Sequence, residues 1–266
     1  MRRGFASFVL TLFICGPAWA QDWAKANVDK SPRHQEWVDI KYGNRTVHSF
    51  IVYPEVKDKA TAVVVIHEIF GASDWARSFA DQVAAAGYIA IMPDLLSGMG
   101  PNGGGTSSLG DRSAVTEAIG KLPPDQITAD LNAVADYVTK LPAANGKLVV
   151  AGFCWGGGQS FRFATDRKKL AAAMVFYGVG PDPKAMGNIM APVYGFYAGN
   201  DARIGATLAD TTAAMKAAGK KFEPVTYEGA GHGFMRAGED PANTVEANKT
   251  ARDEAWARLK KILAGI

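Results

Sequence analysis

The sequence predicts an α/β protein with a mainly parallel central sheet, helices on both faces and an N-terminal antiparallel hairpin. Apolar, β-branched runs such as TAVVVIHEIFG at 61–71 alternate with helical segments, which is typical of a parallel sheet covered on both faces. Gly43-Asn44 separates two stretches of alternating apolar and polar residues, as a two-residue hairpin turn does. The 266 residues contain no internal repeat or heptad array that would favour another class.

The elements expected in order follow this alternation. Gly87 should close the first helix as a C-cap, and Pro124 should open a later helix at its first position. The glycine-rich stretch 97–111 is expected to be a flexible loop. The predicted strands are 36–42, 45–53, 61–71, 88–95, 147–153, 171–177, 192–198 and 222–227, and the predicted helices are 74–86, 124–140, one from 156, 205–218 and 242–263.

Residues 1–20 have the order of a secretory signal. Two arginines, an apolar stretch and the small-residue sequence AWA follow one another, which predicts cleavage after Ala20. The alternative is a buried N-terminal helix. The apolar stretch is too short to span a bilayer comfortably. We therefore expect an exported, periplasmic or secreted protein without stable membrane insertion, and one domain over residues 21–266.

Charge and cysteine content narrow the function classes. The chain has 29 Lys and Arg against 26 Asp and Glu, and loss of the two arginines in 1–20 lowers the balance from +3 to +1. No basic stripe indicates nucleic acid. The histidines are scattered and show no metal-ligand spacing, so no metal or cofactor is expected. After cleavage Cys154 is the single thiol, and an unpaired cysteine in a secreted protein is a candidate reactive group.

Cys154 lies in the most informative motif, GFCWGG at 152–157. Glycines two positions on either side, between a predicted strand and a predicted helix, are typical of a nucleophile elbow. The N-terminus of that helix should lower the thiol pKa. The alternative is a small buried cysteine in a glycine turn.

An acid and a histidine follow at later strand ends. His232, in EGAGHGF, can serve as a general base or can be a surface turn residue. Asp201, in YAGNDARI, can orient that histidine, with Asp182 as its rival, and either aspartate can instead cap the next helix. The order Cys154, Asp201, His232 is the nucleophile–acid–histidine order of α/β-hydrolases. His67, at a strand end, is expected to be structural.

Four motifs together resemble the dienelactone hydrolase family over roughly residues 40–266. They are HEIFG at 67–71, GFCWGG, the AGNDA turn, and GAGHGFMR, which ends at Arg236. The resemblance implies a one-domain α/β-hydrolase without a metal that opens an enol-lactone or related ester through a thioester intermediate. It matches Cys154 to the nucleophile, Asp201 to the acid and His232 to the base.

The resemblance also implies roles for further residues. Glu68 matches a glutamate that helps to deprotonate the thiol, and its alternative is a solvated or salt-bridged side chain. The backbone N–H groups of Ile69 and Trp155 match the oxyanion hole, one lying after the nucleophile and one after a central strand. Arg236 matches an arginine that grips the substrate carboxylate, and its alternative is a surface arginine. A second family arginine after the PDL strand is missing, and Arg112 lies just beyond that place.

The sequence therefore predicts a hydrolase of a small, possibly carboxylated ester or lactone that acts through a Cys-Asp-His triad. A general carboxylesterase or thioesterase on the same fold is the nearest alternative. A redox-sensing or binding protein on a hydrolase scaffold is the non-enzymatic alternative. The natural substrate and the oligomeric state cannot be predicted from these residues.

Overall fold

The computed structural model describes residues 21–266, and the predicted export signal, residues 1–20, lies outside the described residues. The strands are β1 (Gln35–Tyr42), β2 (Arg45–Val52), β3 (Ala60–Ile66), β4 (Ile89–Pro93), β5 (Ala144–Phe153), β6 (Ala172–Phe176), β7 (Val193–Ala198) and β8 (Phe222–Tyr227). The helices are α1 (Asp22–Asp29), α2 (Asp74–Ala85), α3 (Arg112–Gly120), α4 (Pro124–Thr139), α5 (Trp155–Asp166), α6 (Ala202–Ala217), α7 (Phe234–Ala237) and α8 (Glu246–Ala264), with 3₁₀ turns at Pro101–Gly103, Thr106–Ser108 and Pro183–Asn188.

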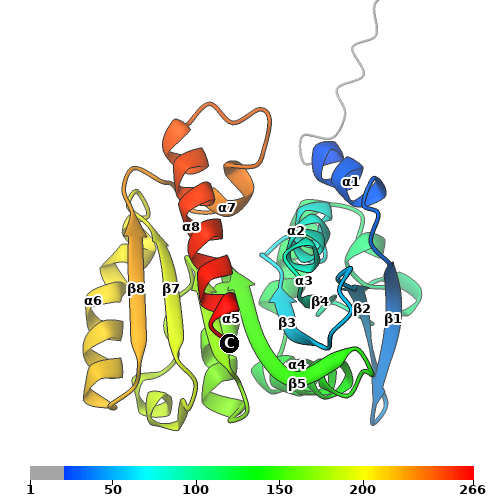
Figure 1. The fold of residues 1–266 in the computed structure, drawn as a ribbon, viewed down its shortest axis with the longest axis horizontal. Coiled ribbons are helices and arrows are strands. Elements are labelled where there is room, and N and C mark those ends of the chain that lie inside the picture. The colour runs from blue at the N-terminus through cyan, green and yellow to red at the C-terminus, as the bar shows by residue number, and fades with distance from the viewer. Residues whose placement is uncertain (1–20) are drawn as a thin grey trace, which may run out of the picture.

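The eight strands form one sheet in the order β1-β2-β4-β3-β5-β6-β7-β8 (Figure 1). Strands β3 to β8 pair in parallel, and the β1–β2 hairpin joins them through an antiparallel β2–β4 pairing. The predicted fold class, a mainly parallel α/β sheet with an antiparallel hairpin, is confirmed. Parallel strands place their carboxyl ends, and the loops that follow them, at one edge.

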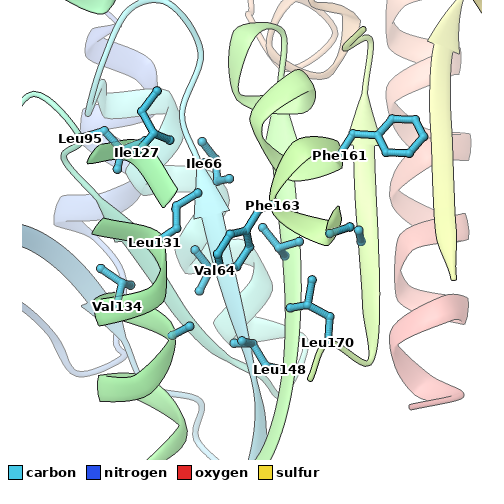
Figure 2. Packing of buried hydrophobic residues seen from close by; sticks show 14 of the residues in the cluster. Val64, Ile66, Leu95, Ile127, Leu131, Val134, Leu148, Phe161, Phe163 and Leu170 are labelled. Carbon is cyan, nitrogen blue, oxygen red and sulfur yellow. The ribbon is translucent and has the colours of Figure 1, made fainter. Parts of the chain in front are cut away.

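Alternating side chains of the central strands divide the core between the two faces of the sheet. Val64 belongs to the cluster covered by α3, α4, α5 and α6, whereas its neighbour Val65 belongs to the cluster covered by α1, α2 and α8. In Figure 2, Val64 and Ile66 of β3 lie beside Leu131 of α4 and Phe163 of α5. Because both faces are buried, these strands are apolar throughout rather than alternating, as the sequence indicated.

The glycine-rich stretch 97–111 differs from the expected flexible loop. The backbone N–H and the hydroxyl of Thr106 donate to the buried Asp94 carboxylate, each at 2.7 Å, and the same hydroxyl accepts from the Ala72 N–H at 3.0 Å. A Cβ atom at Gly105 would lie 2.2 Å from Asp94 Oδ2. Glycine is used here for close approach, and the middle of the loop is anchored to Asp94, the residue that follows β4.

Some elements differ from the predicted ones. Helices α1, α3 and α7 were not predicted, and β3 ends at Ile66, so HEIFG lies beyond the strand in a loop. This difference places Glu68 and Ile69 at the carboxyl edge of the sheet. None of the helices in residues 21–266 combines the length and the apolar character that crossing a bilayer requires.

Candidate active site

Cys154 occupies a sharp turn between β5 and α5. Its φ of 57° and ψ of −118° lie outside the common regions for a side-chain-bearing residue. A Cβ atom at Gly152 would lie 1.9 Å from the carbonyl oxygen of Gly156, and one at Gly156 would lie 2.3 Å from that of His67. Only glycine fits at these positions, so the spacing recognised in the sequence is imposed by the approach of α5 to β5 and β3.

The thiol of Cys154 is half-buried among groups that change its proton affinity. Burial raises its pKa above the ordinary value, and the negative charge of Glu68 raises it further, while the backbone N–H groups of Trp155 and Ile69 lower it. The sequence predicted a lowered pKa from the helix N-terminus alone. The N–H of Trp155, the first residue of α5, does lower the pKa, but burial and the neighbouring carboxylate outweigh that contribution.

His232 and Asp201 form a pair at the ends of β8 and β7. Nδ1 of His232 lies 2.5 Å from Oδ2 of Asp201, which is buried. Because a carboxylate only accepts, Nδ1 carries the hydrogen and Nε2 is left to exchange a proton. Oδ1 of Asp201 accepts from the Ile204 N–H at 3.2 Å and caps α6. Asp201 therefore contacts His232 and caps α6 at the same time, whereas the exposed Asp182 caps the 3₁₀ turn at 183–188.

Tyr177 connects this pair to the elbow. The Cys154 N–H donates to the carbonyl of Phe176 at 3.0 Å. The ring of the next residue, Tyr177, meets the His232 imidazole edge-on, with 5.0 Å between the ring centroids. The elbow and the histidine thus lie on either side of the end of β6.

Glu68 is buried, with 3% of its surface exposed, and its Oε2 lies 2.9 Å from Nε of Arg236 on α7. Burial raises the pKa of the Glu68 carboxyl, and the charges of Arg236 and His232 oppose that rise. Of the two alternatives for Glu68, the solvated one is excluded and the salt bridge is present. Arg236 is not a simple surface arginine, because 28% of its side chain is exposed.

His67 of HEIFG and Trp155 pack against each other beside the elbow. His67 is fully buried, and its Nε2 accepts from the Leu95 N–H at 3.3 Å while its Nδ1 lies 2.8 Å from the carbonyl oxygen of Glu68. The structural role predicted for His67 is therefore confirmed. The Trp155 ring stacks on His67 at 5.6 Å between centroids and 17° between planes, which holds the first residue of α5 against the HEIFG loop.

Two features of the site were not predicted. The guanidinium of Arg112 lies 3.9 Å from the centroid of the Phe70 ring, and that of Arg236 lies 5.3 Å from it. Arg112 is exposed at the start of α3. The sequence signal for Arg112 was its place beside the glycine-rich loop. The second feature is Tyr177, whose φ is +41°. No sequence pattern indicates a role for this residue.

The site thus combines an elbow thiol, a histidine–aspartate pair, a buried carboxylate and backbone N–H groups at one sheet edge. Within residues 21–266, no three His, Cys, Asp or Glu side chains are grouped so as to hold a metal ion. A family model described as "Dienelactone hydrolase family" matches residues 47–266. The chain belongs to the dienelactone hydrolase family. As a member of this family it is a hydrolase of carboxylic esters, a class that includes lactones.

Individual proteins agree with this family assignment. A protein of Salmonella typhi named "Putative carboxymethylenebutenolidase" is 34% identical over 200 residues, which cover 70% of this chain and 72% of that protein. One of the same name from Saccharolobus solfataricus is 30% identical over 254 residues, which cover 83% and 94%. The crystal structure of a "Putative Dienelactone Hydrolase" from Klebsiella pneumoniae superposes with a TM-score of 0.75 at 26% identity, over 88% of this chain and 99% of that one.

Proposed function

We propose that this dienelactone hydrolase relative cleaves small carboxylated esters or lactones through a thioester on Cys154. The observation that carries the proposal is the Asp201–His232 pair, 2.5 Å apart, at the sheet edge that also bears the elbow thiol. A sensing thiol would need no such pair, because its reaction requires no general acid or base. The family places the substrate among carboxylic esters. The thiol favours cleavage through a thioester, and the arginines favour esters that carry a carboxylate.

The resting thiol is protonated, since burial and Glu68 both raise its pKa. A substrate carboxylate competes with Glu68 for the planar guanidinium of Arg236. Once freed from Arg236, Glu68 accepts the proton of the thiol, and the sulfur becomes a nucleophile only when a substrate is bound. This order accounts for a cysteine whose pKa is raised rather than lowered in the free enzyme.

Acylation and deacylation then use the remaining groups. The thiolate attacks the carbonyl carbon, and the oxyanion is held by the N–H groups of Ile69 and Trp155, which lie beside the sulfur. Glu68 passes the thiol proton on to Nε2 of His232, and His232, oriented by Asp201, delivers that proton to the leaving oxygen. His232 then takes a proton from water, which attacks the thioester, and returns it to the sulfur of Cys154 as the thiol is released. A lactone leaving group stays attached after ring opening and departs with the acid.

The decisive experiment traps the acyl-enzyme. Cys154 is the only cysteine in residues 21–266, so mass spectrometry after quenching with a lactone, an aryl ester or an acyl thioester should show one acyl group on the peptide that contains it. Cys154→Ala should remove both the adduct and turnover while the protein stays folded. Turnover by Cys154→Ala would exclude the thioester. Faster turnover of the acyl thioester than of the lactone would instead favour a thioesterase.

The carboxylate preference is tested separately with a matched pair of esters, one anionic and one neutral. Arg236→Lys keeps the charge but loses the planar fork, so kcat/KM should fall for the anionic ester more than for the neutral one. Arg258→Lys is the control, because Arg258 donates to backbone carbonyls of β7 and β8 instead. An equal loss for both esters would contradict a carboxylate-binding role of Arg236.

We also propose that residues 1–20 act as an export signal and are removed after Ala20. The proposal is supported by their order of charged, apolar and small residues. Cell fractionation followed by N-terminal sequencing should find Gln21 as the first residue in the exported fraction. A cytoplasmic protein that retains Met1 would contradict export.

A further inference from the structure

The hydroxyl group of Tyr177 is buried without a hydrogen-bond partner. Tyr177 directly follows β6, none of its surface is exposed, and within residues 21–266 its hydroxyl has no donor or acceptor in range. Its φ of +41° is also uncommon for a bulky side chain. An unsatisfied buried hydroxyl is unfavourable, and phenylalanine would fill the same space without that cost. The oxygen atom of Tyr177 therefore calls for a role outside the resting structure.

The ring of Tyr177 lies against the turn 232–234, which the Glu68–Arg236 ion pair also approaches. It meets His232 at 5.0 Å and Phe234 at 5.2 Å between centroids, edge-on in both cases. Between those two residues, a Cβ atom on Gly233 would lie 3.7 Å from Glu68 Oε1 and 3.6 Å from Arg236 Nη2. The tyrosine ring and the ion pair thus both approach the turn 232–234.

The charges around the hydroxyl keep it protonated. Burial raises the pKa of Tyr177 well above its ordinary value, and the negative charge of Glu68 adds to the rise, while Arg236 opposes it. The thiol of Cys154 and the carboxylate of Glu239 act in the same direction as Glu68. Near neutral pH, Tyr177 is therefore a neutral O–H donor in the field of a buried carboxylate.

We propose that Tyr177 is a positioning residue for Glu68, whose carboxylate accepts a hydrogen bond from the tyrosine hydroxyl after a substrate carboxylate has displaced it from Arg236. The inference rests on the proposed function. A buried carboxylate that loses its ion-pair partner needs another donor. The buried hydroxyl of Tyr177, which is unpartnered in the described part of the chain, supplies it. The proton of Cys154 Sγ then passes to the free oxygen of Glu68, the electron pair stays on sulfur, and Tyr177 keeps its own proton.

The test removes only the hydroxyl oxygen of Tyr177. Tyr177→Phe should lower kcat/KM for the anionic ester about ten- to a hundredfold, the range for a hydrogen bond to a charged group. The neutral ester leaves Glu68 on Arg236, so its hydrolysis should change less than twofold. The melting temperature should not fall, because the lost hydroxyl had no partner.

Tyr227→Phe is the matched control. The Tyr227 hydroxyl is also buried without a hydrogen bond within the described chain, and its ring also packs against Phe234, at 5.2 Å. Its hydroxyl senses the charge of Arg258 rather than that of Glu68. Tyr227→Phe should therefore leave the kcat/KM of both esters unchanged.

A pH profile separates positioning from packing. The deficit of Tyr177→Phe with the anionic ester should shrink as the pH approaches the raised pKa of the thiol, because Cys154 then ionises without Glu68. A deficit that is equal for both esters and at every pH would overturn the proposal in favour of a packing role.

Glu68→Gln distinguishes the two levels of the argument. If Glu68→Gln leaves the anionic ester unaffected, the proposed function of Glu68 fails, and this inference fails with it. If Glu68→Gln is impaired but Tyr177→Phe equals wild type, only the inference about Tyr177 is wrong. In the double variant that combines Glu68→Gln with Tyr177→Phe, the kcat/KM for the anionic ester should equal that of Glu68→Gln alone.

Discussion

At the scale of single residues, Asp201 performs two tasks with two oxygen atoms. Oδ1 caps α6 through the Ile204 N–H, and Oδ2 accepts from His232. Asn is as good an N-cap as Asp, but its amide cannot hold the histidine in the required tautomer. Asp201→Asn should therefore keep the free energy of unfolding nearly unchanged and lower kcat about 10³- to 10⁴-fold. Urea denaturation and steady-state kinetics on one preparation would measure both.

Alanine at the same position provides the comparison. Asp201→Ala should lose the cap as well as the orientation of His232, and so be less stable than Asp201→Asn by about 1 kcal/mol. Equal stability of the two variants would show that the cap contributes nothing. Normal kcat in Asp201→Asn would exclude Asp201 as the acid of the triad.

A second prediction concerns the charge of Glu68. Glu68 raises the pKa of Cys154, so Glu68→Gln should shift that pKa downward and increase the thiolate fraction near neutral pH. The rate of alkylation by iodoacetamide should then reach half its maximum at a lower pH than in wild type, although hydrolysis of anionic esters slows. Glu117→Gln, at an exposed carboxylate on α3, should leave the profile unchanged. A midpoint that stays or rises would contradict the argument.

The sequence predicted the identity of the site residues better than their electrostatics. Motif spacing and strand ends identified Cys154, Asp201 and His232, because those positions are fixed by turn geometry that leaves a local pattern. The sign of the thiol pKa shift could not be predicted, since it depends on burial and on Glu68, 86 positions away in the chain. Tyr177 was missed for the same reason: its neighbours come from other strands and from α7.

At the scale of elements, the loop 97–111 is held by Thr106. Its hydroxyl both donates to Asp94 and accepts from Ala72, which follows the HEIFG segment. Thr106→Val has nearly the same shape but leaves both partners without this hydrogen bond. It should lower the free energy of unfolding by about 1–3 kcal/mol and raise KM, because the loop that carries Ile69 loses a contact.

A threonine on the neighbouring helix serves as the control. The exposed Thr116 hydroxyl bonds only the Arg112 carbonyl one turn back, so Thr116→Val should have little effect on urea denaturation or KM. A similar loss of unfolding free energy in both variants would mean that Thr106 acts through helix or strand propensity and not through its hydrogen bonds to Asp94 and Ala72.

Long elements with a clear apolar period were predicted, and short or polar ones were not. Most strands of the central sheet and helices α2, α4, α6 and α8 were predicted to within a few residues, whereas β3 ends five residues before its predicted end and only the start of α5 was predicted. Helix α7 has four residues, too few to show a period. Helix α3 is capped by Asp111 immediately after the glycine-rich stretch, which concealed its start. Glycine content alone does not distinguish a loop that needs glycine for close approach from a flexible linker.

At the scale of the whole molecule, Glu239 joins α2 to α8. It accepts from Trp75 Nε1 at 3.0 Å, from Gln82 Nε2 at 3.1 Å and from Arg252 Nε at 2.8 Å. Glu239→Ala should lower the free energy of unfolding by about 3 kcal/mol, because it leaves a buried indole N–H and a largely buried guanidinium without their partner. Urea denaturation checks this value. Glu117→Ala, which breaks only the exposed pair with Lys121, should show no measurable change.

The order of the strands could not be predicted beyond the parallel class. Alternation of strands and helices indicates parallel pairing, but β4 lies outside β3 and the hairpin pairs with β4 through β2. These placements depend on which face each connecting helix covers, and the strands themselves are equally apolar on both faces. The sequence therefore predicted the layers of the molecule but not the order of strands within the sheet.

The backbone of Cys154 limits which side chains can replace its sulfur during evolution. At a φ of 57° and a ψ of −118°, a second heavy atom on Cβ would be a severe steric burden. Threonine is thereby excluded as a substitute, and serine remains the only hydroxyl that the turn can accept. An ancestral exchange between thiol and alkoxide chemistry at this position would thus need a single atom to change, and selection could act on reactivity while the fold stayed the same.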